Sequence, residues 1–468
     1  MSFIISGLII LVSIISLNLI SPYFLEEKNL ISQPVIEFVL LYISACLIYF
    51  VFVVRIKRYR VKIRHLLVWI FIVGIIARLI MVISTPILEV DFYRYLWDGA
   101  VTANGYNPYE YSPQEFIKGK SNEKLPERLR KLSINNLKTL EKINHPQLKS
   151  SYPPVTQAVF AFSNLIKPFS LTTWKVLLLI IDIITFFLIY LVLKKLKIPE
   201  SNLIIYWWNP LLIKEVFNSG HMDVIIFPFL LACFLLYLSK KYLFSFAVLC
   251  AAVGVKLWPV LLLPVLLRNF VSDWKKFLKY FSIFSVLTFF ILSPLIFSFF
   301  DQASGLQAYS RSWQNNDSFF RIILAAAEFV LPLFGYHPGH GQLVSRIAVG
   351  LVLIFAIVYL IKNKSDGRLD YFKISLVIIS FAFFLSPAQF PWYYLWMLPF
   401  LTIIPYKPLL LLTALMPLYY LRYYFEPRGQ YEIYYQYIVW LEYLPVLAWI
   451  LYDLIKSRHF KAARLIAN

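Results

Sequence analysis

The stretch LLVWIFIVGIIARLIMVISTPILEVDFYRYLWDG, residues 66–99, begins as an apolar run and ends in acidic, basic and aromatic residues. The apolar part is long enough to cross a lipid bilayer as one helix, because a spanning helix needs about 20 residues. The polar part, with Glu89, Asp91, Arg94 and Asp98, would then lie at a membrane surface. Charged residues in such a position are candidates for a functional site.

The whole chain shares this apolar character. It has 468 residues, of which 60% are hydrophobic, whereas soluble domains are about 45–50% apolar. Apolar runs of about 18 residues or more recur along the chain, which indicates many transmembrane helices. We therefore predict an all-α polytopic integral membrane protein that forms a single domain over residues 1–468. The first run, residues 3–20, lacks a basic leader and a cleavage site of small residues, so we expect a retained helix.

The net charge of +20 could suggest a nucleic-acid partner. Its distribution argues against one, because the basic clusters lie in short gaps between the apolar runs. The gaps are residues 55–65, 194–197, 268–279 and 362–368, together with a basic segment near the C-terminus. This is the positive-inside pattern of membrane proteins, so we expect the gaps to be cytoplasmic and expect no nucleic acid to bind.

Placing the basic gaps in the cytoplasm assigns the other segments to sides of the membrane. Residues 89–171 become an extracytoplasmic loop, and the apolar segments 153–166 and 318–334 become helices at the outer surface. Two pieces, 242–254 and 256–268, are each too short to cross without tilting. The other predicted helices are 3–22, 34–54, 66–88, 172–193, 200–217, 222–239, 276–299, 343–361, 370–386, 391–405, 408–424 and 433–455, which gives roughly 12–14 spans with both termini inside.

Polar residues from several separate segments are expected at the outer surface, and this convergence is the strongest indication of a site. If the segment after residue 90 is helical, Asp91, Arg94, Tyr95 and Asp98 share one face. Asp91 could accept a proton from a hydroxyl group there, or it could simply pair with Arg94.

Three further groups have two readings each. Lys256 in GVKLWP could attract a phosphate at the outer leaflet, or it could extend to the interface as an anchor. His221 and Asp223 could contact a sugar or a phosphate, and two such residues alone are weak evidence for a metal. The proline-broken aromatic segment 386–399 could pack within the bundle or form a groove for a lipid chain.

Six segments occur in an order that resembles bacterial GT-C membrane glycosyltransferases, and in particular the polyprenol-phosphate-mannose-dependent mannosyltransferase-like proteins. The segments are DFYRYLWDG with GYNPYEYSP, YPPVTQAVF, WNPLLIKEVFNSGHMD, GVKLWPVLLLP, YSRSWQNNDSFF and SPAQFPWYYLWMLP. The resemblance covers about residues 66–404. Each motif is weakly specific by itself, and six in the same order are much more specific.

The resemblance implies transfer of a sugar, with mannose favoured, from a polyprenyl-phosphate donor to a hydroxyl group of a glycan, lipid or protein. Transfer would occur at the extracytoplasmic face of the cytoplasmic membrane, with inversion and an aspartate as general base. The acid of the first large outer loop matches Asp91, with Glu89 as competitor. The Gly-His-x-Asp motif matches Gly220, His221 and Asp223. The expected donor contacts are Arg94, Trp97, Asp98, His221, Asp223, Lys256, Trp313 and Asn316, and the expected lipid groove is Trp392, Tyr393 and Tyr394.

Two alternatives stay open at this point. We assign no metal ligands, although a divalent cation is a possible cofactor. A multi-pass transporter or flippase of a lipid-linked or small polar substrate would also have many helices and intramembrane charges. That class predicts paired halves and a polar site at the middle of the membrane, and the sequence shows neither.

Overall fold

Helices form nearly all of the regular structure. The computed structural model describes residues 3–25, 30–55, 63–118, 125–363 and 367–466. Parts of the basic gaps 55–65 and 362–368 lie outside these ranges. Within them, extended pairing is confined to one bridge between Asn315 and Ala388. The predicted all-α fold is therefore confirmed.

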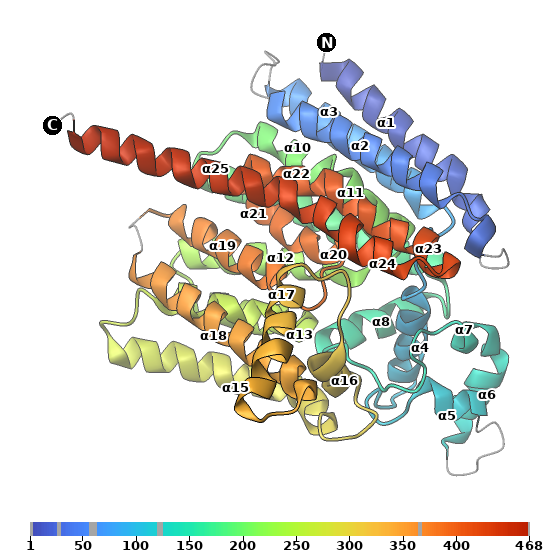
Figure 1. The fold of residues 1–468 in the computed structure, drawn as a ribbon. Coiled ribbons are helices and arrows are strands. Elements are labelled where there is room, and N and C mark those ends of the chain that lie inside the picture. Colours follow the sequence, from blue (N-terminus) through green and yellow to red (C-terminus); the bar gives the residue numbers. More distant parts are fainter. Residues whose placement is uncertain (1–2, 26–29, 56–62, 119–124, 364–366, 467–468) are drawn as a thin grey trace.

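Seven long helices run through most of the molecule (Figure 1). They are α1 (Phe3–Ile20), α2 (Val35–Arg55), α3 (Ile63–Val82), α9 (Leu171–Leu196), α15 (Trp274–Ser298), α18 (Gly341–Lys362) and α25 (Val439–Ile466). Shorter helices lie between them: α4 (Phe92–Ala103), α5 (Pro113–Lys118), α6 (Glu127–Asn135), α7 (Leu137–Glu141), α8 (Pro154–Ile166), α10 (Leu203–Trp207), α11 (Pro210–Leu212), α12 (Ile226–Leu238), α13 (Tyr242–Val255), α14 (Leu263–Leu267), α16 (Gly305–Ser312), α17 (Phe319–Val330), α19 (Asp370–Phe384), α20 (Pro391–Tyr394), α21 (Leu398–Ile403), α22 (Lys407–Leu415), α23 (Arg422–Phe425) and α24 (Tyr431–Ile433).

The described residues contain 7 helices that are long and apolar enough to cross a membrane, and the protein is an integral membrane protein. The number becomes 8 if the pair Pro210–Asn218 and Met222–Leu238, which bends by 104°, is one span. Our expectation of 12–14 spans is not met by this measure. Several predicted spans are interrupted, because a proline removes a helix hydrogen bond and clashes with the preceding turn. Residues 391–405, for example, are divided between α20, a 3₁₀ turn and α21.

Several of the long helices keep many apolar side chains exposed. The first three helices pack together, and α12, α13 and α15 form a second layer. In α15, only 17% of the residues in its apolar stretch are buried, and the fraction is the same in the helical segment that contains α18. Exposed apolar side chains on such long helices are suited to contact with lipid chains, so these two helices present a membrane-facing surface.

Residues 89–171 contain α4 to α8, which gather beside one end of the long helices (Figure 1). Helix α4 packs directly on α8. A Cβ atom at Gly99 of α4 would lie 2.5 Å from the carbonyl oxygen of Phe160 in α8, so only glycine permits this close approach. At 13 residues, α8 is too short to span a bilayer, in agreement with the prediction that it does not cross.

Candidate active site

A cavity of about 440 Å³ lies between the α4–α8 region and the interrupted helices. Its wall is formed by parts of residues 89–95, 144–153, 222–223, 255–258, 305–313, 382–396 and 419–423. Segments far apart in the sequence therefore contribute to one cavity. Asp91 and Lys256 both line it, which is the arrangement that a base and a phosphate-binding cation would need.

Asp91 immediately precedes α4, and its side chain lines the cavity. It makes no capping hydrogen bond to the helix. Within the described residues its carboxylate accepts one long hydrogen bond, 3.5 Å, from Nδ2 of Asn144. Burial raises the pKa of the Asp91 carboxyl, which makes the carboxylate a stronger base. The group can therefore accept a proton from a ligand in the cavity.

Arg94 also lines the cavity, but it pairs with Asp98 and not with Asp91. Its Nε donates to Oδ1 of Asp98 at 2.8 Å, and its Nη1 donates to the carbonyl oxygen of Leu148 at 2.9 Å. Asp98 accepts a further hydrogen bond of 2.6 Å from Oγ of Ser150. Nη2 of Arg94 is buried without a hydrogen-bond partner in the described part of the chain. The guanidinium is thus oriented by a buried acid, and its Nη2 remains available to donate to a ligand.

Lys256 follows α13 and carries its ammonium group on the cavity wall. Nζ donates to Oδ1 of Asp223 at 2.5 Å, and the same oxygen accepts a hydrogen bond of 2.6 Å from Nε1 of Trp396. The ammonium lies 4.2 Å from the ring centroid of Tyr393 and 4.8 Å from that of Trp396. A cation held in this way, with 20% of its side chain exposed, can attract an anion into the cavity.

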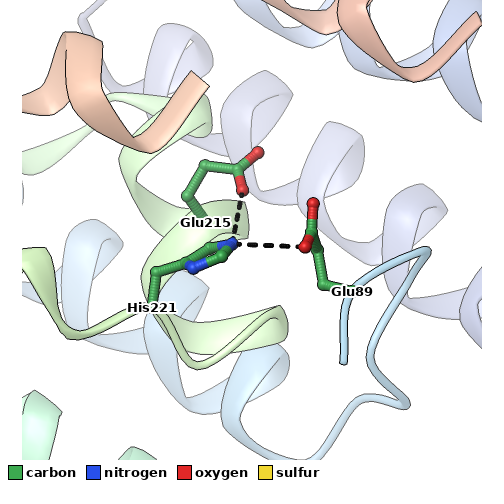
Figure 2. A group of neighbouring side chains, drawn as sticks. All are labelled: Glu89, Glu215 and His221. Carbon is green, nitrogen blue, oxygen red and sulfur yellow. Dashed lines mark ion pairs between the residues drawn. The ribbon is translucent and has the colours of Figure 1, made fainter. Parts of the chain in front are cut away.

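Glu89, which also lines the cavity, forms a buried cluster with Glu215 and His221 (Figure 2). Nε2 of His221 lies 3.6 Å from Oε2 of Glu89 and 3.7 Å from Oε2 of Glu215. The hydroxyl of Tyr420 is 3.1 Å from Oε1 of Glu89. Burial raises the pKa of Glu89 to about 7. Glu89 is therefore held by His221 and Tyr420, whereas Asp91 has one long hydrogen bond and is more open to a ligand. Among the described residues, Glu89, Glu215 and His221 are the group that could hold a metal ion.

The predicted lipid groove is divided between two environments. Trp392 and Tyr393 line the cavity, and His221 stacks on Trp392 with 3.8 Å between ring centroids. Tyr394 is fully buried on another side, where its hydroxyl donates to the carbonyl oxygen of Leu409 at 2.8 Å. Tyr394 therefore supports the bundle.

Several expected contacts do not reach the cavity wall. Trp97 is 1% exposed and packs against Phe116 in a separate hydrophobic cluster formed by the 89–171 segment. Asn316 is buried, donates to Oε2 of Glu442 at 2.8 Å and accepts 2.6 Å from the hydroxyl of Tyr434. Asp98 and His221 are also buried behind lining residues. These side chains are not part of the cavity wall, whereas Trp313 lines it.

Other lining residues had no assigned role in the sequence. Tyr309 and Trp258 line the cavity. They belong to YSRSWQNNDSFF and GVKLWPVLLLP, two of the six segments that carry the family resemblance, so those motifs could have indicated them. Asn144, Tyr419 and Tyr423 also line it. They lie outside the motifs that we singled out, so only the tertiary structure assigns them to the site.

The family model described as alpha-(1->6)-mannopyranosyltransferase, N-terminal domain, matches residues 24–271, more than half of the chain. The chain belongs to this family. The comparisons with curated proteins and with solved structures gave no match. The matched range includes Asp91, Asp223 and Lys256, and the cavity wall from residue 305 onward lies outside it. Membership agrees with the GT-C resemblance and identifies a membrane mannosyltransferase.

Proposed function

We propose that this mannosyltransferase uses a polyprenyl-phosphate mannose as donor and transfers the mannose with inversion to an acceptor hydroxyl group. The observation that carries the proposal is the position of Asp91 and Lys256 on the wall of one cavity. A proton acceptor and a cation in one cavity match the two ends of such a reaction, the attacking hydroxyl and the leaving phosphate.

The acceptor oxygen would attack the anomeric carbon of the mannose while the bond from that carbon to the phosphate oxygen breaks. The carboxylate of Asp91 takes the proton of the acceptor hydroxyl. The leaving group is a polyprenyl phosphate, whose negative charge Lys256 stabilises, assisted by the unpartnered Nη2 of Arg94. A phosphate monoester leaves without a proton, so no second acid is required.

The stereochemistry restricts the donor further. A single displacement inverts the anomeric centre. The family description specifies an alpha-(1->6) linkage. An inverting enzyme that forms an α-linkage needs a β-linked donor, and we therefore propose a β-linked polyprenyl-phosphate mannose and a primary hydroxyl at position 6 of the acceptor sugar.

The lining of the cavity also suits a sugar that carries a lipid chain. The lining combines charged groups with aromatic rings, among them Trp313, Trp392 and Trp396. Aromatic faces stack on sugar rings and pack against apolar chains. The exposed apolar helices α15 and α18 mark a membrane-facing side through which a polyprenyl chain could extend.

We also propose that the cavity faces the extracytoplasmic side of the cytoplasmic membrane. The last turn of α18 carries Lys362 and the first turn of α15 carries Lys275 and Lys276, and these two helix ends point away from α4–α8 (Figure 1). Because basic gaps stay in the cytoplasm, α4–α8 would face outward.

The test is transfer in proteoliposomes that contain labelled polyprenyl-phosphate mannose and a mannoside acceptor. We expect an α-(1→6)-linked product from the native protein and at least about a 100-fold lower rate from Asp91→Asn, since a general base contributes about 10²–10⁴-fold. Asp273→Asn is the control, because Asp273 is a partly exposed residue that caps α15. Transfer by Asp91→Asn at the native rate would contradict the base assignment, and counterflow of the donor without any product would favour the flippase.

A further inference from the structure

We propose that Glu89, Glu215 and His221 bind one divalent transition-metal ion, with Zn²⁺ the preferred ion, in a site next to the cavity. The proposal goes beyond sugar transfer and does not depend on which sugar or acceptor the enzyme uses. Each residue contributes one donor atom: a carboxylate oxygen from each glutamate and a ring nitrogen from the histidine (Figure 2).

The distances between the donor atoms fit a metal site. All three lie within 4.8 Å of one another, and the two distances from Nε2 of His221 are 3.6 and 3.7 Å. With Zn–N and Zn–O bonds of about 2.0–2.2 Å, neighbouring donors of a tetrahedral site are about 3.3–3.5 Å apart. A small inward movement of the two carboxylates would therefore complete three of four positions and leave one position open.

His221 provides evidence that is independent of the acidic residues. Its side chain is fully buried, and neither ring nitrogen has a hydrogen-bond partner in the described residues. A buried polar atom without a partner costs free energy, so such an atom calls for an explanation. The stacking on Trp392 holds the ring with Nε2 directed between the two glutamates. Neutral imidazole in this position is a ready metal ligand.

Charge balance also favours a cation. Two carboxylates are buried here, and Nζ of Lys214 lies 3.5 Å from Oε1 of Glu215. Among the described residues Lys214 is the one lysine or arginine within 4.0 Å of either carboxylate, and Arg422 acts on Glu89 from farther away, so the two buried carboxylates are incompletely compensated, which is costly. A divalent ion would remove the excess negative charge. The competing explanation is a proton on Glu89 or on His221, and the experiment below separates the two.

The backbone brings the donors together through unusual local structure. Glu215 lies in a π-helix, Ile213–Asn218, and π-helical turns occur frequently at functional sites. Leu88, immediately before Glu89, adopts a positive φ of 58°, which is strained for a leucine. The side chain of Asn218 links the two segments, because its Oδ1 accepts from the backbone N–H of Ile87 at 2.9 Å and its Nδ2 donates to Oγ of Ser84 at 2.7 Å. The backbone conformation and the hydrogen bonds of Asn218 therefore hold the segments that carry Glu89 and Glu215 in place, so the cluster is not a chance approach of flexible side chains.

A bound ion would connect this cluster to the cavity. Glu89 lies two residues before Asp91, and Trp392, which stacks on His221, lines the cavity. The ion would therefore act as a positioning element that fixes the segment before α4 and, through His221, the part of the cavity wall that contains Trp392. The open fourth position would belong to a water molecule or to a ligand in the cavity.

The test measures metal directly on the purified, detergent-solubilised full-length protein. After treatment with a chelator and reloading with Zn²⁺, elemental mass spectrometry should find about one ion per chain. Reloading with Co²⁺ should give the visible absorption of a tetrahedral or five-coordinate site. Glu215→Gln and His221→Gln should each lose this metal, whereas Glu442→Gln should retain it, because Glu442 is an equally buried glutamate that contacts Asn316 and is not one of the three donors.

Folding is followed in parallel by thermal unfolding and gel filtration. Zn²⁺ should raise the unfolding temperature of the native protein and of Glu442→Gln but not that of the two ligand variants. The proposal is overturned if folded native protein retains no metal after incubation with Zn²⁺, Co²⁺ or Mn²⁺, or if all three variants bind it equally. Metal content is measured without a transfer assay. A protein that binds the ion but does not transfer mannose would therefore contradict the proposed function and still support the metal site.

Discussion

Nζ of Lys256 lies 2.5 Å from Oδ1 of Asp223, and this ion pair forms part of the cavity wall. Asp223 is almost completely buried, and Trp396 donates a second hydrogen bond to the same oxygen. The carboxylate of Asp223 therefore holds the ammonium of Lys256 at the cavity surface, and part of the Lys256 side chain stays exposed. A lysine that only anchored a helix at the membrane interface would not need a buried acid behind it.

Replacing Lys256 should weaken use of the donor. We expect Lys256→Gln to lower kcat/KM for polyprenyl-phosphate mannose by about 10–100-fold, because a charge-assisted hydrogen bond contributes about 1.5–3 kcal/mol. The single change also leaves Asp223 buried without its cation, with only the hydrogen bond from Trp396 to hold its charge, which destabilises the fold. The double variant Lys256→Gln/Asp223→Asn removes that effect, and it should regain stability without regaining donor affinity. Native kinetics in the double variant would show that Lys256 does not bind the phosphate.

The neighbouring tyrosines Tyr393 and Tyr394 should behave differently. Tyr393→Leu should raise the KM for the donor several-fold, since the ring lines the cavity and faces the ammonium of Lys256. Tyr394→Phe should leave that KM unchanged and lower the free energy of unfolding by about 1–2 kcal/mol, because its buried hydrogen bond to Leu409 is lost. Donor titrations and thermal unfolding of both variants test this. Equal effects of the two changes on KM would contradict the division of the aromatic segment.

The approach of α4 to α8 depends on Gly99. Gly99→Ala should lower the free energy of unfolding by about 1–3 kcal/mol, because the added methyl group would collide with the backbone at Phe160. It should also reduce transfer, since α4 follows directly from Asp91. Gly350→Ala in α18 is the matched control, because a Cβ there meets no atom within 4 Å, and alanine stabilises a helix. Thermal unfolding of both variants provides the comparison.

The proposed orientation can be tested by labelling with a membrane-impermeant maleimide. The native cysteines are buried, so an introduced cysteine can be followed. Lys131→Cys in α6 and Lys276→Cys in α15 replace side chains that are 73% and 62% exposed. Intact cells should show labelling at residue 131 and require permeabilisation for residue 276. The opposite result would place the cavity on the cytoplasmic side.

The helix positions followed closely from the sequence. Residues 3–22, 34–54 and 172–193 were expected as helices, and the structure forms α1, α2 and α9 over nearly the same residues. Such agreement is expected, because a chain in lipid must satisfy its backbone hydrogen bonds within each helix. The number of spans was not predictable in the same way, since it depends on where prolines interrupt a helix and how far the two halves bend.

The site was predictable only in part. The sequence indicated Asp91 as a base, Lys256 and Trp313 as donor contacts and Trp392 as part of a lipid groove, and all four line the cavity. It could not assign Trp97 to the core. The sequence around an aromatic residue does not show whether its side chain faces a cavity or the hydrophobic core. For Trp97 this depends on how α4 is rotated against α8. The pairing of Glu89 with Glu215 and His221 was equally hidden, because it requires a π-helix and a bend of 104° between two helices.

The sequence by itself determined that this chain is a helical membrane protein with polar groups gathered at the ends of apolar runs, because burying charge in lipid is costly whatever the fold. Only the tertiary structure decided which of those groups share a cavity, which support it from behind and which pair with one another. Those outcomes depend on side-chain direction, and direction is set by how helices rotate, break and pack against each other.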